Sequence, residues 1–173
     1  MPASLEGIRV QPGLGPLAKL YQEHFAAASR LAYLLTGDAD LAEDLVQDAF
    51  VKLIRRFADL RNPRSFDAYL RRTIVTLSYG SFRRRRIERA HLARAAGLAD
   101  RTSDALPDVE GRDQLWSQLQ RIAPRQRAAL VLRYYEDLSE QQTADILDCS
   151  LRTVRSLVAR GMQAMRAQQE VES

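Results

Sequence analysis

The chain has 173 residues, of which 46% are hydrophobic and 28% are charged, as in a soluble globular protein of one domain or two small ones. No apolar run approaches the roughly 18 residues that a membrane helix needs, and the first residues lack the basic start and apolar core of a signal peptide. The single cysteine excludes an internal disulfide. Together these features predict a cytoplasmic protein.

The net charge of +4 is unevenly distributed along the chain. Residues 71–94 contain eight arginines against one acidic residue, Glu88, whereas residues 95–118 contain two basic and five acidic residues. A general bias towards arginine explains why Arg replaces Lys here, but it does not explain the clustering. A localised basic block indicates a polyanion as partner.

The first half of the chain predicts three helices. Apolar residues follow a 3.6-residue period from 17 to 35, and Gly37 ends that pattern. A second helix is expected to begin with Asp38 or Asp40 as its cap. A third is expected to begin near Phe66 and to run into the basic block.

The second half predicts a linker and a further set of helices. Residues 96–112 are rich in Gly, Pro, Asp and Ser and lack an apolar period, which is typical of a flexible linker. Helical patterns resume after it, and no stretch of the chain shows a convincing strand pattern. The predicted fold class is therefore all-α, with two small helical domains, 17–95 and 113–169, joined by this linker.

Residues 139–160 predict a helix-turn-helix. Ser139 starts the first helix, Asp148 lies at the bend where such proteins usually have Gly, and Ser150 caps the second helix. Asp is one of the non-glycine residues enriched at positive φ, so the bend is compatible with it. Several polar residues of the second helix share one side and form a candidate surface for the DNA major groove: Arg152, Thr153, Arg155, Ser156 and Arg160.

The second predicted helix has an unusual outer face. Acidic and amide side chains recur on it at spacings of three and four: Asp40, Glu43, Asp44, Gln47 and Asp48. Like charges on one face repel each other slightly, and a solvated face more often alternates its signs. The pattern leaves two interpretations open, a binding surface for a protein with basic or amide groups and an ordinary solvated surface.

Two long motifs carry a resemblance to a known family. The run DADLAEDLVQDAFVKLIRRF resembles the polymerase-binding helix of bacterial RNA polymerase sigma factors. The run IAPRQRAALVLRYYEDLSEQQTADILDCSLRTVRSLVARGMQAMR resembles their C-terminal DNA-binding domain. The short form with these two domains is similar to the extracytoplasmic-function (ECF) group, and the resemblance covers about residues 17–167. It implies a sigma factor that binds core RNA polymerase, directs it to specific promoters and helps to melt them.

The resemblance also implies which residues act in each role. The clamp coiled coil of the largest polymerase subunit would bind Asp44, Gln47, Asp48 and Phe50. The downstream promoter element would be held by Arg61, Asn62, Arg64, Ser65, Phe66, Arg72, Thr76, Arg83, Arg84, Arg85 and Arg86. Within this set, residues 61–66 would pocket an extruded base of the non-template strand. The helix-turn-helix would read the upstream element as duplex DNA, and an anti-sigma protein would be a further partner, as for many members.

Some positions depart from the family's usual residues. The family often has Asn at the position of Thr76, Gly at that of Arg152 and a polar residue at that of Leu157. Together with Asp148, these departures leave the promoter preference open.

The sequence does not favour an enzyme. The two histidines are far apart, and no metal-ligand spacing, phosphate-binding glycine loop or nucleophile elbow is present, so no metal or cofactor is expected. Two other classes of protein remain as alternatives. One is a dimeric helix-turn-helix regulator that binds duplex DNA without polymerase, with residues 17–95 as its dimerisation or effector domain. The other is an adaptor that binds only proteins. Copurification with core polymerase separates a sigma factor from both.

Overall fold

The computed structural model describes residues 15–56, 63–95 and 114–172, and within these ranges it contains helices and no strand. The predicted linker lies outside the described residues. The elements in chain order are α1 (Gly15–Thr36), α2 (Ala39–Arg56), α3 (Pro63–Ala95), α4 (Gln114–Gln120), α5 (Pro124–Leu130), the π-helix η2 (Val131–Tyr135), α6 (Glu140–Leu147) and α7 (Leu151–Glu172). The all-α prediction is confirmed for the described residues.

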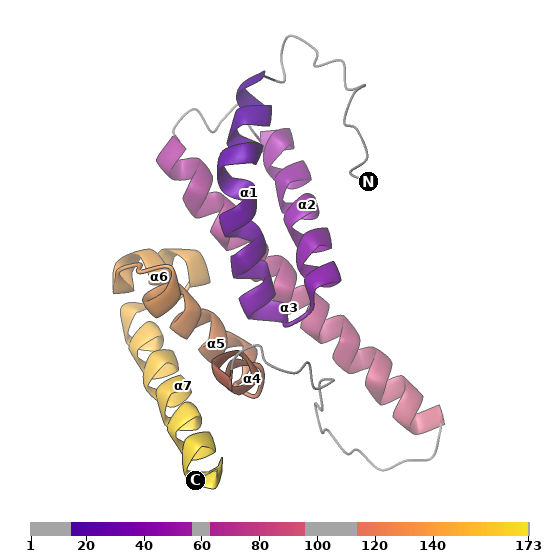
Figure 1. The fold of residues 1–173 in the computed structure, drawn as a ribbon, viewed down its shortest axis with the longest axis vertical. Coiled ribbons are helices and arrows are strands. Elements are labelled where there is room, and N and C mark those ends of the chain that lie inside the picture. The colour runs from indigo at the N-terminus through magenta and orange to yellow at the C-terminus, as the bar shows by residue number, and fades with distance from the viewer. Residues whose placement is uncertain (1–14, 57–62, 96–113, 173) are drawn as a thin grey trace.

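Helices α1, α2 and α3 pack against one another and form the N-terminal bundle (Figure 1). Gly37, at φ +74°, separates the first two helices, as the sequence predicted. Asp38 rather than Asp40 caps α2, because its Oδ1 accepts a hydrogen bond of 2.9 Å from the backbone N–H of Leu41. The inward stripes meet in a core in which several aliphatic side chains are almost fully buried, among them Leu31, Leu35, Val46, Leu53 and Ile74.

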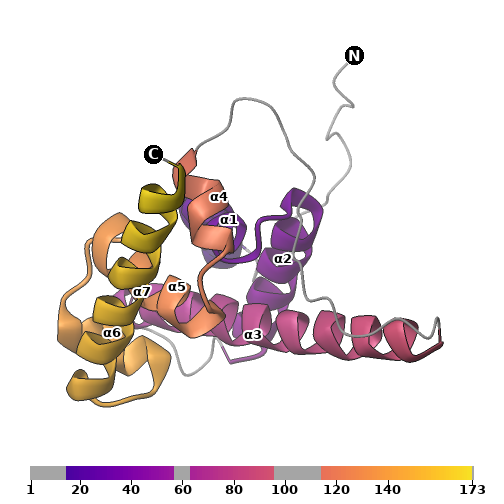
Figure 2. The same ribbon diagram turned by 90° about the horizontal axis from the view of Figure 1, so that it is seen from below.

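Helix α3 is longer than the sequence pattern predicted. It begins at Pro63, three residues before the predicted start, because proline has a fixed φ suited to the first helical position and lacks an N–H that would have no helical acceptor there. It then continues through the basic block to Ala95 as one helix. Its C-terminal part projects beyond the other helices, as Figures 1 and 2 both show.

The C-terminal helices contain the predicted helix-turn-helix as α6 and α7. Ser139 caps α6 with a capping box that includes Gln142. Asp148 adopts the left-handed conformation at the bend, with φ 51° and ψ 56°. The hydroxyl of Ser150 accepts a hydrogen bond from the backbone N–H of Thr153 and so caps α7.

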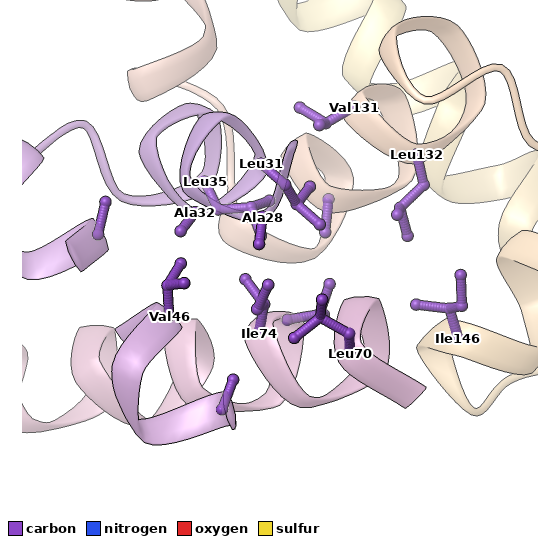
Figure 3. Packing of buried hydrophobic residues seen from close by; sticks show 14 of the residues in the cluster. Ala28, Leu31, Ala32, Leu35, Val46, Leu70, Ile74, Val131, Leu132 and Ile146 are labelled. Atoms are coloured by element: carbon purple, nitrogen blue, oxygen red, sulfur yellow. The ribbon is translucent and has the colours of Figure 1, made fainter. Parts of the chain in front are cut away.

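The N-terminal bundle and the C-terminal helices are packed together. Figure 3 shows Leu70 of α3, Leu132 of η2 and Ile146 of α6 pointing into the space between these three elements, and all three side chains are buried. On the other side of the contact, Tyr33 of α1 stacks on Trp116 of α4, with ring centroids 5.7 Å apart. A continuous hydrophobic core therefore joins the two parts of the chain.

A buried arginine reinforces this contact. The guanidinium of Arg127, on α5, donates hydrogen bonds to the backbone carbonyl of Leu35 in α1 and to the carbonyl oxygens of Gln120 and Ile122. It also lies over the ring of Phe82 in α3, 5.1 Å from the centroid. One side chain thus contacts α1, α3 and the end of α4.

Candidate nucleic-acid and partner interfaces

The acidic stripe of α2 lies on the surface. Its five members, Asp40, Glu43, Asp44, Gln47 and Asp48, are all exposed, whereas the opposite face of the helix is buried in the bundle. Beyond the stripe, Val51 and Ile54 continue the same side of the helix at helical spacing and remain 49% and 46% exposed. Exposed apolar side chains beside a charged stripe are typical of a protein interface. The sequence pattern missed these two residues because they resemble ordinary core positions.

Phe50 does not belong to this surface. Its side chain is only 5% exposed, and its ring lies 4.7 Å from that of Tyr21 and 6.1 Å from that of Phe66, centroid to centroid. The prediction that Phe50 is part of the polymerase-binding surface is therefore wrong for direct contact, since a large apolar ring gains more from burial in the bundle than from exposure.

The predicted pocket for an extruded base is described only in part. Arg61 and Asn62 lie outside the described residues, as does the side chain of Arg64. Ser65 is half-buried in the first turn of α3. Phe66 is 2% exposed and packs against the ring of His24, so the prediction that it contacts a base is wrong in this arrangement. A core aromatic at this position instead anchors the start of α3.

Most of the predicted basic surface of α3 is accessible. Arg72, Thr76, Arg83, Arg84 and Arg86 are exposed. Arg72, Thr76 and Arg83 share one face, because spacings of four and seven bring side chains to the same side of a helix. This face can offer guanidinium groups to phosphate oxygens over several turns of helix.

Arg85 has a different partner from its neighbours. Its Nη2 lies 2.8 Å from Oδ2 of Asp38, the cap of α2. The N–H of Leu41, and after it this guanidinium, lower the pKa of the Asp38 carboxyl below its usual value. The structure thus gives Arg85 an intramolecular partner, and its contact with DNA stays a prediction.

The predicted upstream surface lies on α7. Arg152, Arg155 and Arg160 are exposed, whereas Thr153 and Ser156 are half-buried. Nε of Arg155 lies 2.8 Å from Oε2 of Glu140 at the start of α6. The pair is exposed, so its net contribution to stability is at most about 1 kcal/mol. Arg155 can therefore leave this carboxylate for a stronger partner.

Helix α7 is held in place by tight packing. Val154 is fully buried against the neighbouring helices. Gly161 is also buried, and a Cβ added there would lie 2.8 Å from Cδ1 of Leu130 in α5. The side of α7 opposite its arginines thus approaches α5 closely, which fixes the orientation of the exposed face.

Other kinds of site find no support in the described part of the chain. No cluster of three or more His, Cys, Asp or Glu suitable for a metal ion occurs among residues 15–56, 63–95 and 114–172. None of the helices described in these ranges is long and apolar enough to cross a bilayer.

Comparison with protein families shows which kind of protein carries these surfaces. Residues 20–87 match the model of sigma-70 region 2, and residues 112–165 match that of sigma-70 region 4. The chain is an RNA polymerase sigma factor of the ECF group. As a sigma factor, it is not an enzyme. Region 2 covers the acidic stripe and most of α3, and region 4 contains the helix-turn-helix.

Individual relatives agree with this assignment. The chain is 32% identical to the RNA polymerase sigma-E factor of Streptomyces avermitilis over 147 residues, covering 85% of this chain and 80% of that protein. It is 33% identical to the ECF RNA polymerase sigma factor SigE of Mycolicibacterium smegmatis over 156 residues, covering 86% of this chain and 59% of that protein.

A solved structure shares the fold. The sigma factor RpoE in complex with the anti-sigma factor NepR from Bartonella quintana superposes with a TM-score of 0.69 at 22% identity, covering 91% of this chain and 99% of that one.

Proposed function

We propose that this sigma factor binds core RNA polymerase through the acidic stripe of α2, and binds promoter DNA through α3 and α7. The observation that carries the proposal is the presence of both sigma regions in order, each with an exposed polar surface. The alternative of a dimeric regulator is not favoured. Residues 20–87 match sigma-70 region 2 over 68 residues, and a dimerisation domain would have no reason to share that sequence. Its place of action is the cytoplasm, where polymerase meets the chromosome.

The polymerase contact rests on Asp44, Gln47 and Asp48, which are exposed on one side of α2. Carboxylates and an amide on a regular helix can pair with basic and amide groups of the clamp coiled coil. Val51 and Ile54 extend this surface beyond the stripe with apolar area, which adds a hydrophobic part to the charged one.

The promoter contacts divide between region 2 and region 4 of the chain. Arginines 83, 84 and 86 position the DNA through phosphates, which supplies affinity without sequence information. Residues 61–65 would hold an extruded base of the non-template strand, which offsets the few kcal/mol lost on unstacking it. Arg155 and its neighbours on α7 would read base edges of the upstream element in the major groove.

An anti-sigma protein is a further proposed partner. Support comes from the shared fold with RpoE, which was solved in complex with the anti-sigma factor NepR. Such a partner would keep the sigma factor from core polymerase until a signal releases it.

In-vitro transcription with core polymerase and genomic templates tests the proposal. The wild-type protein should create defined start sites that core alone lacks. Asp48→Arg should abolish core binding while leaving helicity and melting temperature nearly unchanged, because exposed substitutions usually cost within about 0.5 kcal/mol. Glu23→Arg, an equal charge reversal at an exposed position of α1, is the matched control and should retain core binding. Normal core binding by Asp48→Arg would refute the assignment of the stripe.

A second experiment separates the two promoter contacts. Arg155→Ala should weaken recognition by about 1–3 kcal/mol and relax the preference at one or two upstream base pairs, while core binding survives. Exchanging residues 62–64 for another loop should instead change the preferred base at one downstream position on the non-template strand. A uniform loss over all upstream sequences would mark Arg155 as a phosphate contact.

A further inference from the structure

Helix α3 extends beyond the part of the chain that matches region 2. The match ends at residue 87, yet α3 continues as one helix to Ala95. Residues 88–95 add about 12 Å of helix, since each residue advances an α-helix by about 1.5 Å. Figures 1 and 2 show that this end of α3 projects away from the other helices. We call residues 88–95 the α3 extension.

The α3 extension continues a strongly basic stretch of the helix. Residues 83–95 contain six arginines and one acidic residue, Glu88, and most of their side chains are exposed. Among the residues that the structure describes, no carboxylate pairs with Arg83 or Arg94. A projecting helix with this excess of positive charge attracts a polyanion.

One arginine of the α3 extension lies in line with the proposed DNA-binding face of the helix. Arg94 follows Arg83 by 11 residues, and at about 100° per residue the two side chains differ in direction by only about 20°. Arg83 in turn shares its side of the helix with Thr76 and Arg72. One row of polar side chains therefore runs from Arg72 to Arg94 over about 33 Å, close to the length of one turn of duplex DNA.

Residues that are less suited to phosphate contacts lie on other sides of the α3 extension. Around the helix axis, Glu88 lies about 120° from Arg94, and Leu92 lies about 160° from it. Between Arg83 and Arg94, the side that carries the row holds Ile87 and Ala90, which have no charge. The row thus presents guanidinium groups along the extension without a carboxylate among them.

We propose that the α3 extension binds the sugar-phosphate backbone of the duplex DNA between the two promoter elements, through Arg94 in line with Arg83. This inference rests on the proposed function, in which α3 holds the downstream element and α7 reads the upstream one. The chain passes from the first of these surfaces through the extension towards the second, so the DNA between the two elements is the polyanion that the extension meets. Arg83 and Arg94 are about 16 Å apart along the helix, which corresponds to about five base pairs. Such a contact supplies affinity but carries no sequence information.

The salt dependence of promoter binding by the holoenzyme measures the contact. Affinity for a promoter fragment with a mapped start site is determined between about 50 and 200 mM salt. Arg94→Gln removes one phosphate contact and should reduce the slope of log affinity against log salt concentration by about 0.9. Arg94→Lys keeps the charge and should retain the wild-type slope, because a single phosphate contact needs a positive charge more than the fork of a guanidinium.

Arg30→Gln is the matched control, because it removes an equal charge at an exposed position of α1. It should leave the slope unchanged. Equal slopes for wild type and Arg94→Gln would overturn the proposal.

Directed cleavage locates the DNA that the extension meets. An iron chelate that generates hydroxyl radicals is attached to the full-length chain through His91→Cys, an exposed position three residues before Arg94, in a Cys149→Ser background. In the holoenzyme on the promoter, the cuts should fall in the DNA backbone between the two elements. The same chelate attached through Gln22→Cys, at an exposed position of α1, is the matched control and should not cut there. Cuts in a polymerase subunit instead would assign the extension to a protein partner, and cuts in neither would leave it as a solvated helix; either result overturns the proposal.

Two readouts separate this inference from the proposed function. Copurification with core polymerase and the mapped start sites test the proposed function alone, and both should be the same for Arg94→Gln as for wild type. The effect of Arg94→Gln on affinity tests the extension alone, and it should persist when the bases between the two elements are exchanged at constant length, because phosphates are the same in every sequence. An effect that appears with only one sequence between the elements would mark Arg94 as a base contact and refute the backbone contact.

Discussion

The same substitution, Gly→Ala, is expected to have opposite effects in two helices of this protein. Gly80 lies in the interior of α3, is exposed, and a Cβ built there meets no atom within 4 Å. Alanine should therefore stabilise the protein by about 0.5–1 kcal/mol, since it restricts the unfolded chain and favours the helix. Gly161 lies in α7, where the new Cβ would be 2.8 Å from Cδ1 and 3.0 Å from Cγ of Leu130.

At Gly161 the cost of overpacking should exceed the gain in helix propensity. Leu130 is 4% exposed, so its methyl groups cannot move aside without displacing core neighbours. Overpacking of this kind costs about 1–3 kcal/mol, which exceeds the gain of at most about 1 kcal/mol in helix propensity. We expect Gly161→Ala to destabilise the protein by about 1 kcal/mol, or a decrease of about 2–4 °C in melting temperature.

Urea and thermal unfolding of the two single variants measure the difference. A double variant with Leu130→Val is informative, because the shorter side chain makes room for the new Cβ. Its loss of stability should be smaller than the sum of the two single losses by about 0.5 kcal/mol or more. If Gly161→Ala stabilises the protein as much as Gly80→Ala does, the close approach of α7 to α5 is not the constraint that the structure indicates.

Three further outcomes are expected. The N–H of Leu41 and the guanidinium of Arg85 lower the pKa of Asp38, so its carboxylate stabilises the fold above about pH 4. This contribution is lost as the pH falls through the lowered pKa. The free energy of unfolding of Asp38→Asn, measured in urea, should therefore depend less on pH below 5 than that of wild type. Ser139→Ala should cost about 1 kcal/mol in urea unfolding, because it removes the capping box of α6. Burial raises the pKa of Tyr79 to about 12, so its neutral form contributes stability that is present below pH 10 and lost as the pH rises towards 12. An absorbance titration of Tyr79→Phe should lack the tyrosine transition at the highest pH. An unchanged titration would contradict the burial of Tyr79.

Local signals in the sequence predicted the helices and their ends well. Ser139 and Ser150 cap α6 and α7 as expected, and Gly37 separates the first two helices, because capping and positive φ depend on a few neighbouring residues. The left-handed bend at Asp148 was also anticipated. The periodic apolar pattern begins only at Phe66 and so predicts too late a start for α3, whereas the helix already begins at Pro63.

Contacts between distant parts of the chain could not be predicted in this way. Arg127 donates to the carbonyl of Leu35, 92 residues away, and nothing in the sequence around either residue indicates that pairing. The resemblance to family motifs predicts Phe50 and Phe66 as contact residues, yet both rings lie in the core of this structure. A motif shows which helix faces a partner, but burial decides which of its side chains reach that partner.

The wide turn of η2 determines the angle at which the C-terminal domain meets α3. In a π-turn the backbone N–H bonds five residues back, as the N–H of Glu136 does to the carbonyl of Val131, so the turn contains one residue more than an α-helical turn. Each residue of an α-helix advances the chain by about 100°. Losing one residue here would restore a regular helix, and it would rotate Glu136 away from Arg71 by about a quarter-turn. A single-residue deletion in this short segment would therefore break the contact between Oε2 of Glu136 and Nε of Arg71 in α3, 2.6 Å apart, while leaving every side chain of both binding surfaces unchanged.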